Sequence, residues 1–282
     1  MIDPISRFLQ RQAGNHGPVM LVYHSVVPGK GTADWRYAIS MQRFVAQLDF
    51  LASEGWTTVT MSELAKFPER YASGRTVGIT FDDGFADNFP AFEELARRGM
   101  CASWFVVSGS LGRPPAWQSS GQPRERLLSG GELRQMRDAH MEIGSHTVSH
   151  VRLTEVDDAR LTQELRDSKH TLEDVLGLEV PAFAYPHGAW NERCEEAVRL
   201  AGFRTACTTQ TGWALRDGNP YRLRRLTVFS TDTPGNLARM LAFGTNEAAP
   251  LEIARYALNQ FRNRFAINRN GARNSAGSNN TK

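Results

Sequence analysis

Two adjacent carboxylates, Asp82 and Asp83, follow a short β-branched run that ends at Phe81. Side chains alternate in direction along a strand, so the two acids point different ways where the strand ends. One of them can bind a cation while the other stays free to move protons. An Asp-Asp-Gly segment by itself more often forms a turn, so this chemistry requires partners from elsewhere in the chain.

Two histidines four residues apart, His146 and His150, follow the apolar run Met141–Gly144. Their spacing suits two imidazole nitrogens at about 2.0–2.1 Å from one metal ion. Two histidines and one carboxylate leave an open position for water, as a catalytic zinc site requires. An iron oxygenase uses the same ligand set, but the close His-x-Asp spacing typical of such enzymes is absent. The pattern therefore favours metal-assisted hydrolysis.

Two further segments end predicted strands. His24 follows the first predicted strand. In a closed barrel the first strand lies beside the last, so His24 would lie at the same end of the barrel as the acids and the histidine pair. A structural histidine is the alternative. Tyr185, Pro186 and His187 form a predicted turn that could direct backbone N–H groups at a developing oxyanion. An ordinary strand-to-helix turn is the alternative there.

Short apolar runs alternate along the chain with segments of helical period. The predicted strands are Val19–Tyr23, Trp56–Val59, Val77–Phe81, Ser103–Val107, Met141–Gly144, Ala182–Tyr185, Thr205–Thr208 and Leu226–Ser230. The predicted helices are Met41–Glu54, Asn88–Arg98, Gly131–His140, Ala159–Leu176 and Glu192–Ala201. Such alternation indicates a parallel sheet of the α/β class, and seven or eight units favour a closed barrel over a doubly wound open sheet.

A long loop, Gly112–Leu128, interrupts this alternation and contains Trp117. Long loops at the carboxyl ends of barrel strands commonly build the site, so Trp117 is a candidate substrate contact. The predicted domain organisation comprises four parts along the chain. They are an N-terminal extension (1–17), the barrel domain (18–243), a basic amphipathic helix (244–269) and a disordered tail (270–282).

Charge and hydropathy restrict the partners. The net charge is +3, and residues 245–282 hold six basic against two acidic residues, so the barrel is close to neutral. A nucleic-acid-binding domain would carry its basic surface on the fold itself, and no nucleic-acid partner is expected. Without a signal-like or membrane-spanning run, we expect a cytoplasmic protein. The amphipathic segments Ile2–Gln12 and Leu251–Phe265 are expected either to contact a membrane peripherally or to pack on the barrel.

The segments Thr80–Gly84 (TFDDG) and Ser145–His150 (SHTVSH) together resemble the first two motifs of the polysaccharide deacetylases of carbohydrate esterase family 4, the NodB-homology group. The resemblance covers about residues 18–242. It implies a distorted (β/α) barrel of about seven parallel strands and metal-dependent hydrolysis of the N-acyl group of an amino sugar. It also implies roles for individual residues. Asp82 would be the general base, Asp83, His146 and His150 would hold the metal, and the backbone N–H of His187 would complete the oxyanion hole.

Two departures from the common family pattern point to one branch. An Arg that usually lies near Ala184 is absent, and the segment from Phe183 to Gly188 (FAYPHG) resembles enzymes that deacetylate poly-β-1,6-N-acetylglucosamine. No His follows His187, so the usual late general acid is missing. The same branch resembles a circularly permuted fold, in which His24 would protonate the leaving amine. Arg225 is then the candidate to hold Asp82, with Arg224 as the alternative.

The resemblance also implies the cofactor and the substrate class. One divalent metal ion is expected, Zn²⁺ first, with Co²⁺ and Ni²⁺ as alternatives. The expected partner is an N-acetylated glycan or a lipid-linked sugar. A deacylase for a non-sugar amide and a non-catalytic glycan-binding homologue are the competing functions, and an open groove with an aromatic platform would favour a sugar.

Overall fold

The computed structural model describes residues 3–12, 17–29, 34–117, 121–122 and 125–246. Contacts group Met1–Asn246 into one compact unit. The expected helix over 244–269 lies beyond Asn246 for nearly all of its length, and so does the expected tail over 270–282; both are outside the described residues.

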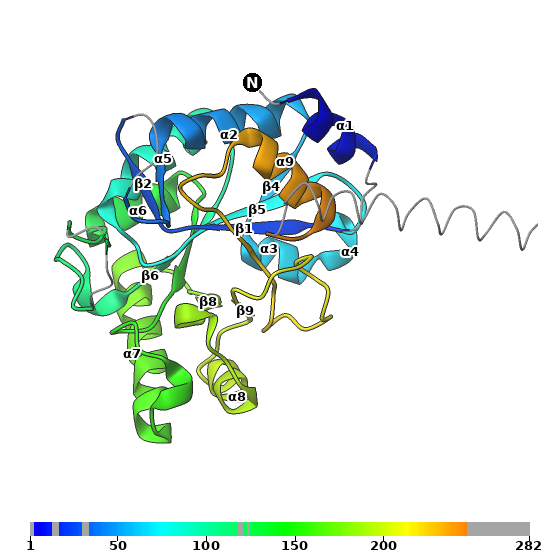
Figure 1. Cartoon of the computed structure of the whole chain (residues 1–282). Helices are drawn as coiled ribbons and strands as arrows, with labels where there is room; N and C mark the ends of the chain where they lie inside the picture. The colour runs from blue at the N-terminus through cyan, green and yellow to red at the C-terminus, as the bar shows by residue number, and fades with distance from the viewer. Residues whose placement is uncertain (1–2, 13–16, 30–33, 118–120, 123–124, 247–282) are drawn as a thin grey trace, which may run out of the picture. The chain divides into compact units, whose positions relative to one another are not determined.

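A parallel sheet forms the centre of this unit (Figure 1). Its strands follow one another in space in the order β10-β1-β5-β6-β7-β8-β9, and β4 pairs with the first half of β5. The strands are β1 (Val19–Tyr23), β4 (Thr57–Val59), β5 (Thr76–Phe81), β6 (Ser103–Val106), β7 (Glu142–Ser145), β8 (Ala182–Ala184), β9 (Thr205–Cys207) and β10 (Leu226–Thr227). All eight predicted strands are present, with bounds that differ by up to three residues.

Two neighbouring strands inside the sheet are fully buried along their length, β1 as VMLVY and β5 as TVGITF. Continuous apolar burial is typical of a parallel strand covered on both faces. Tyr23 pairs with Phe81 in the register of these strands, so both end at the same edge of the sheet. His24 and Asp82 therefore leave the sheet side by side, and the Asp82 N–H donates to the Tyr23 carbonyl at 2.9 Å.

The segment before β10 connects the two ends of the sheet. The Leu223 N–H donates to the Ala206 carbonyl at 3.0 Å, and the Thr208 N–H donates to the Leu223 carbonyl at 2.9 Å. The Arg225 N–H then donates to the Gln210 carbonyl at 3.1 Å. The sheet is thus the distorted barrel of the NodB type that was expected, with its ends joined by an irregular segment.

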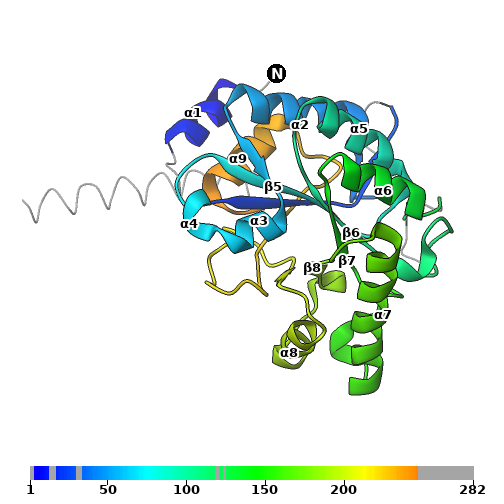
Figure 2. The same cartoon turned by 180° about the vertical axis from the view of Figure 1, so that it is seen from behind.

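Helices flank the sheet, and Figure 2 shows them from behind. They are α1 (Pro4–Gln12), α2 (Met41–Ser53), α3 (Met61–Lys66), α4 (Pro68–Tyr71), α5 (Phe89–Arg97), α6 (Gly130–Asp138), α7 (Asp158–Leu176), α8 (Glu192–Leu200) and α9 (Pro234–Phe243). The first and the last of these, α1 and α9, pack side by side (Figure 1). In the described part of the chain, no helix has the length and apolar character needed to cross a bilayer.

The sequence did not predict helices α3, α4 and α9 or a second, two-stranded parallel sheet. That sheet joins β2 (Ser25–Val27) to β3 (Ala38–Ser40). Three-residue strands are too short to show an alternating pattern, which explains why they were missed. They matter because they run directly after His24 and bring Trp35 and Tyr37 back to the carboxyl end of the barrel.

Candidate active site

A cavity of about 330 Å³ opens at the carboxyl ends of the strands. Seven of the residues singled out from the sequence line it: His24, Asp82, Asp83, Trp117, His146, His150 and His187. The sequence did not identify the other seven: Trp35, Tyr37, Gln122, Arg152, Thr209, Thr227 and Phe229. The fold thus brings together loops that follow β1, β5, β6, β7, β8, β9 and β10.

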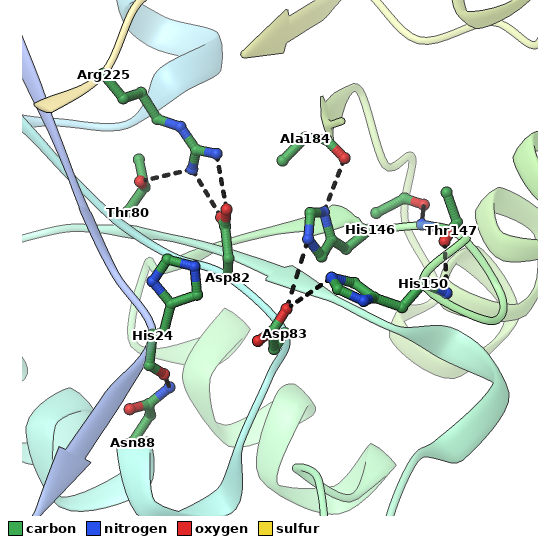
Figure 3. Close-up of polar contacts among 11 residues, drawn as sticks. His24, Thr80, Asp82, Asp83, Asn88, His146, Thr147, His150, Ala184 and Arg225 are labelled. Atoms are coloured by element: carbon green, nitrogen blue, oxygen red, sulfur yellow. Dashed lines mark hydrogen bonds and ion pairs between the residues drawn. The ribbon is translucent and has the colours of Figure 1, made fainter. Parts of the chain in front are cut away.

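Asp83, His146 and His150 form a compact cluster (Figure 3). One ligand atom from each lies within 4.8 Å of the others. The Asp83 Oδ1 atom is 3.6 Å from His146 Nε2 and 3.1 Å from His150 Nε2. One carboxylate and two imidazoles on one side of an open cavity match the donor set of a catalytic zinc site.

The ring of His146 is oriented by the backbone. Its Nδ1 lies 2.8 Å from the Ala184 carbonyl, which accepts a hydrogen bond from it. This bond places the proton on Nδ1 and leaves the lone pair of Nε2 directed at Asp83, as metal-binding histidines require. Burial lowers the pKa of His146 to about 4, although Asp82 and Asp83 oppose the shift. The ring is therefore neutral at neutral pH, which a metal ligand must be.

Asp83 is kept ionised. Burial alone would raise the pKa of this carboxyl, but the hydrogen bond from His150 and the nearby histidines outweigh it and hold the pKa well below its usual value. An ionised carboxylate next to two imidazole rings fits a divalent cation, because it supplies negative charge in a buried place.

Strained backbone gathers at this site. Five of the described residues other than glycine have a positive φ. Four of them belong to this site: Asp83 (70°), Thr147 (69°), His150 (60°) and His187 (59°). Such conformations cost of order 1–3 kcal/mol each and persist only where the surroundings enforce them. The loop that carries both histidines is held in this way. The Thr147 hydroxyl oxygen accepts from the His150 N–H at 3.0 Å.

Glu164 on α7 also holds the histidine loop. It is buried, and its Oε2 accepts from the Val148 N–H at 2.8 Å and from the Ser149 N–H at 3.0 Å. The Ser149 hydroxyl donates to Oε1 at 2.5 Å. The long helix α7 thereby anchors the turn between the two candidate ligands.

The partner of the Asp82 carboxylate is Arg225, not one of the candidate metal ligands. The two Arg225 Nη atoms donate to the two carboxylate oxygens at 2.7 Å each, and both side chains are buried (Figure 3). Arg225 also donates to the Thr80 hydroxyl oxygen at 3.0 Å and to the Thr208 carbonyl at 2.9 Å. Burial alone would raise the pKa of Asp82, but the charge of Arg225, with smaller contributions from histidines, lowers it.

Arg224 has a different partner. Its Nε and Nη2 atoms donate to the Asp217 carboxylate at 2.8 and 2.9 Å, outside the cavity. Of the two arginines considered from the sequence, Arg225 is thus the one next to Asp82.

His24 faces the same cavity from the end of β1. Its backbone carbonyl accepts from Asn88 Nδ2 at 2.8 Å, and its ring packs against Tyr37 and Trp35, with centroids 4.9 and 5.9 Å away. Its Nδ1 atom is buried without a hydrogen-bond partner in the described part of the chain. The contacts to Tyr37, Trp35 and Asn88 fix the position of the ring in the wall of the cavity.

The residues of the Tyr185–Gly188 turn differ in whether they line the cavity. Tyr185 and Pro186 are buried and do not line the cavity, whereas His187 does. Burial and the neighbouring His150 and Arg152 lower the pKa of His187. Gly188, with φ of +66°, lets the turn approach Thr209, because a Cβ there would overlap the Thr209 side chain.

Trp117 completes one wall of the cavity. Its ring stacks on His150, with the two centroids 4.7 Å apart and an angle of 29° between the planes. The long loop after β6 therefore brings an aromatic face beside the candidate metal ligands.

Some of the lining residues that were not predicted could have been found from the sequence. Trp35 and Tyr37 are aromatic residues in a polar segment shortly after His24, and Phe229 follows the last strand. Arg152 stands two positions after His150. An aromatic or charged residue close to a candidate site residue was the signal that could have been used.

The chain is similar to known polysaccharide deacetylases. Residues 69–206 match the family model described as polysaccharide deacetylase. The YxkH protein of Bacillus subtilis (strain 168) is 28% identical over 229 residues, which cover 80% of this chain and 76% of that protein. The poly-β-1,6-N-acetyl-D-glucosamine N-deacetylase of Staphylococcus epidermidis is 25% identical over 205 residues, 68% of each chain.

A solved structure shows the same fold. The deacetylase PplD of Streptococcus pyogenes, determined in complex with acetate, superposes with a TM-score of 0.70 at 22% identity. The match covers 80% of this chain and 98% of that one.

Proposed function

Because the chain contains a polysaccharide deacetylase domain, we propose that it hydrolyses the N-acetyl group of an amino sugar in a polysaccharide, an oligosaccharide or a lipid-linked saccharide. One observation carries the proposal. Asp83, His146 and His150 form a candidate metal site in the same cavity as the arginine-bound Asp82. Metal-assisted hydrolysis of an amide uses both parts, one to bind the cofactor and one to accept a proton.

The cofactor of the proposed reaction is one divalent metal ion held by Asp83, His146 and His150, with Zn²⁺ as the first choice and Co²⁺ or Ni²⁺ as alternatives. When bound, such an ion polarises the amide carbonyl and lowers the pKa of a water molecule toward neutrality. Asp82 takes the proton of the attacking water. Arg225 fixes both oxygens of that carboxylate and keeps it ionised, so it is ready to accept.

The remaining steps are assigned to two further residues. The backbone N–H of His187, in a turn of fixed left-handed conformation, donates to the developing oxyanion. His24 gives a proton to the leaving amine, for which its place in the wall of the cavity is suited.

The walls of the cavity favour a sugar over a non-sugar amide. Trp35, Tyr37, Trp117 and Phe229 line it, and aromatic rings provide flat apolar faces with a large contact area. The presence of both acids and both histidines of the first two motifs also disfavours a non-catalytic glycan-binding protein.

The test is acetate release, followed by mass spectrometry, from a panel of N-acetylated oligosaccharides and lipid-linked sugars. We expect the metal-loaded protein to release acetate and Asp82→Asn to retain the metal but lose activity by at least about 100-fold. Asp217→Asn is the matched control, because it also removes a carboxylate from an arginine pair, outside the cavity. Full activity of Asp82→Asn would refute the role of Asp82, and a protein inactive on every sugar would refute the function.

The role of His24 is tested separately. We expect His24→Gln to lower kcat by about 100-fold or more while the metal content, measured by elemental analysis, stays unchanged. His170→Gln, an exposed histidine on α7, is the control. An unchanged rate in His24→Gln would assign the proton donor to another residue.

We also propose that the protein contacts a membrane surface through α1. Ile5 and Phe8 on this helix are 72% and 61% exposed, while its polar residues Ser6 and Gln10 are buried. An outward apolar face on a helix that also carries arginines suits the interface of an anionic bilayer. The other segment expected to make such a contact, Leu251–Phe265, lies outside the described residues.

A further inference from the structure

We propose that the substrate carries a negative charge close to its acetamido group and that Arg152 binds this charge. The inference rests on the proposed function and specifies its substrate class: an amino sugar that bears, or is linked next to, a phosphate or a carboxylate. The residue lies outside both motifs that carry the family resemblance.

Arg152 lines the cavity and has no strong partner of its own. Its side chain is 47% exposed, and its one ion pair among the described residues is with Glu155, whose Oε1 is 3.8 Å from the Arg152 Nε. That distance is too long for a hydrogen bond. Glu155 is itself 70% exposed, and ion pairs between such side chains are weak. The guanidinium is therefore free to bind a ligand.

The carboxylates of the cavity are already engaged. Both oxygens of Asp82 accept from Arg225, and Asp83 lies against His146 and His150. Among the described residues, the cavity lining includes no other acid. An anionic substrate would thus meet a free cation and no free carboxylate.

A second cation, Arg36, lies against two of the aromatic rings that line the cavity. The Arg36 guanidinium lies 4.4 Å from the ring centroid of Phe229 and 5.1 Å from that of Tyr37, and both rings line the cavity. The described residues include no carboxylate paired with Arg36. It adds positive potential at the mouth, while Arg152 supplies the direct contact, since a guanidinium matches the planar, two-oxygen geometry of phosphate and carboxylate groups.

The experiment compares charged and neutral sugars of matched size. The probes are N-acetylglucosamine 1-phosphate, a disaccharide of N-acetylglucosamine and glucuronic acid, and the methyl glycoside of N-acetylglucosamine. Acetate release gives kcat and KM, and titration calorimetry gives the affinity for each probe without turnover. Wild type and Arg152→Gln are compared at low and high salt. Arg199→Gln is the control, because Arg199 is 53% exposed and has a similar i,i+3 acidic partner outside the cavity.

We expect one or both charged probes to bind more tightly than the methyl glycoside. Arg152→Gln should raise KM and Kd for the preferred charged probe by about 5–10-fold, with less than about a twofold change for the neutral probe. High salt should reduce the preference. A preference for the 1-phosphate indicates a phosphate-linked sugar, and a preference for the disaccharide indicates an acidic polymer.

The opposite results separate this inference from the proposed function. Acetate release without a preference for charged sugars, or a loss in Arg152→Gln that is equal for all probes, overturns the inference and leaves the function intact. Charged-sugar binding that depends on Arg152 without acetate release from any substrate supports the site and overturns the function.

Discussion

Asp82 and Asp83 show how neighbouring residues of the same type acquire different chemistry. They are adjacent in the sequence, yet one carboxylate lies against Arg225 and the other against His146 and His150. The alternation of side chains at the end of β5 makes this division possible. Because Arg225 comes from the far end of the chain and is completely buried, its ion pair with Asp82 also ties β10 to β5.

Asp87 gives a prediction at the residue scale. Its Oδ2 accepts from the Ser25 hydroxyl at 2.5 Å, but its Oδ1 is buried without a partner in the described residues. Burial raises the pKa of Asp87 to about 6 from an ordinary value of 3.8. Since the folded state holds this proton more tightly, the stability that Asp87 contributes is present below about pH 4 and is lost as the pH rises through about 6.

We therefore expect Asp87→Asn to become more stable relative to wild type as the pH rises from 5 to 8. Between these two pH values the gain in the free energy of unfolding is about 1.4 kcal/mol, roughly half of the ~3 kcal/mol that the whole pKa shift corresponds to. Urea unfolding at several pH values measures it, with the exposed Asp138→Asn as the control. A difference between wild type and Asp87→Asn that does not change with pH would contradict the prediction.

At the scale of elements, the site depends on short loops that neighbouring elements hold in place. The loop between β7 and η3 (Leu153–Glu155) carries both candidate histidine ligands. It lies against the segment after β6, where Ser108 and Gly109 donate backbone hydrogen bonds to Thr147 and Val148. A Cβ at Gly109 would overlap the Val148 carbonyl oxygen, so this close approach requires glycine.

Glu164 gives the prediction at this scale. Glu164→Ala removes three hydrogen bonds from the loop, so we expect the affinity for Zn²⁺, measured by competition with a chelator, to fall by about 10–100-fold. Glu173→Ala on the same helix is the control, because it loses contacts to Lys169 and Val180 away from the cavity. Equal affinities in the two variants would show that the loop holds its shape without Glu164.

At the scale of the whole molecule, the N-terminal helix is fixed by charge. The carboxylate of Glu54, only 2% exposed, pairs with Arg7 and Arg11 of α1 and with Arg75 before β5. The three arginine side chains are 44%, 56% and 38% exposed, so solvent weakens each single pair and the anchor depends on all three. The anchor holds the polar side of α1 inward, and this leaves Ile5 and Phe8 facing outward.

The membrane proposal is tested on that outward face. We expect the double variant Ile5→Ser, Phe8→Ser to lose co-sedimentation with anionic phospholipid vesicles, while its free energy of unfolding changes by less than about 0.5 kcal/mol per residue. Leu200→Ser is the control, because Leu200 is equally exposed (72%) on α8. Vesicle binding that persists in the double variant would exclude α1 as the contact.

The sequence by itself determined the eight strands of the main sheet and the clusters around Asp82, His146 and His187, because strand periodicity and local spacing are properties of short segments. Only the tertiary structure decided that Arg225, not Arg224, lies next to Asp82, and that Trp35, Phe229 and Arg152 share the cavity. Such contacts depend on register, on chain closure and on the direction of each side chain. A single sequence carries no direct record of these long-range quantities.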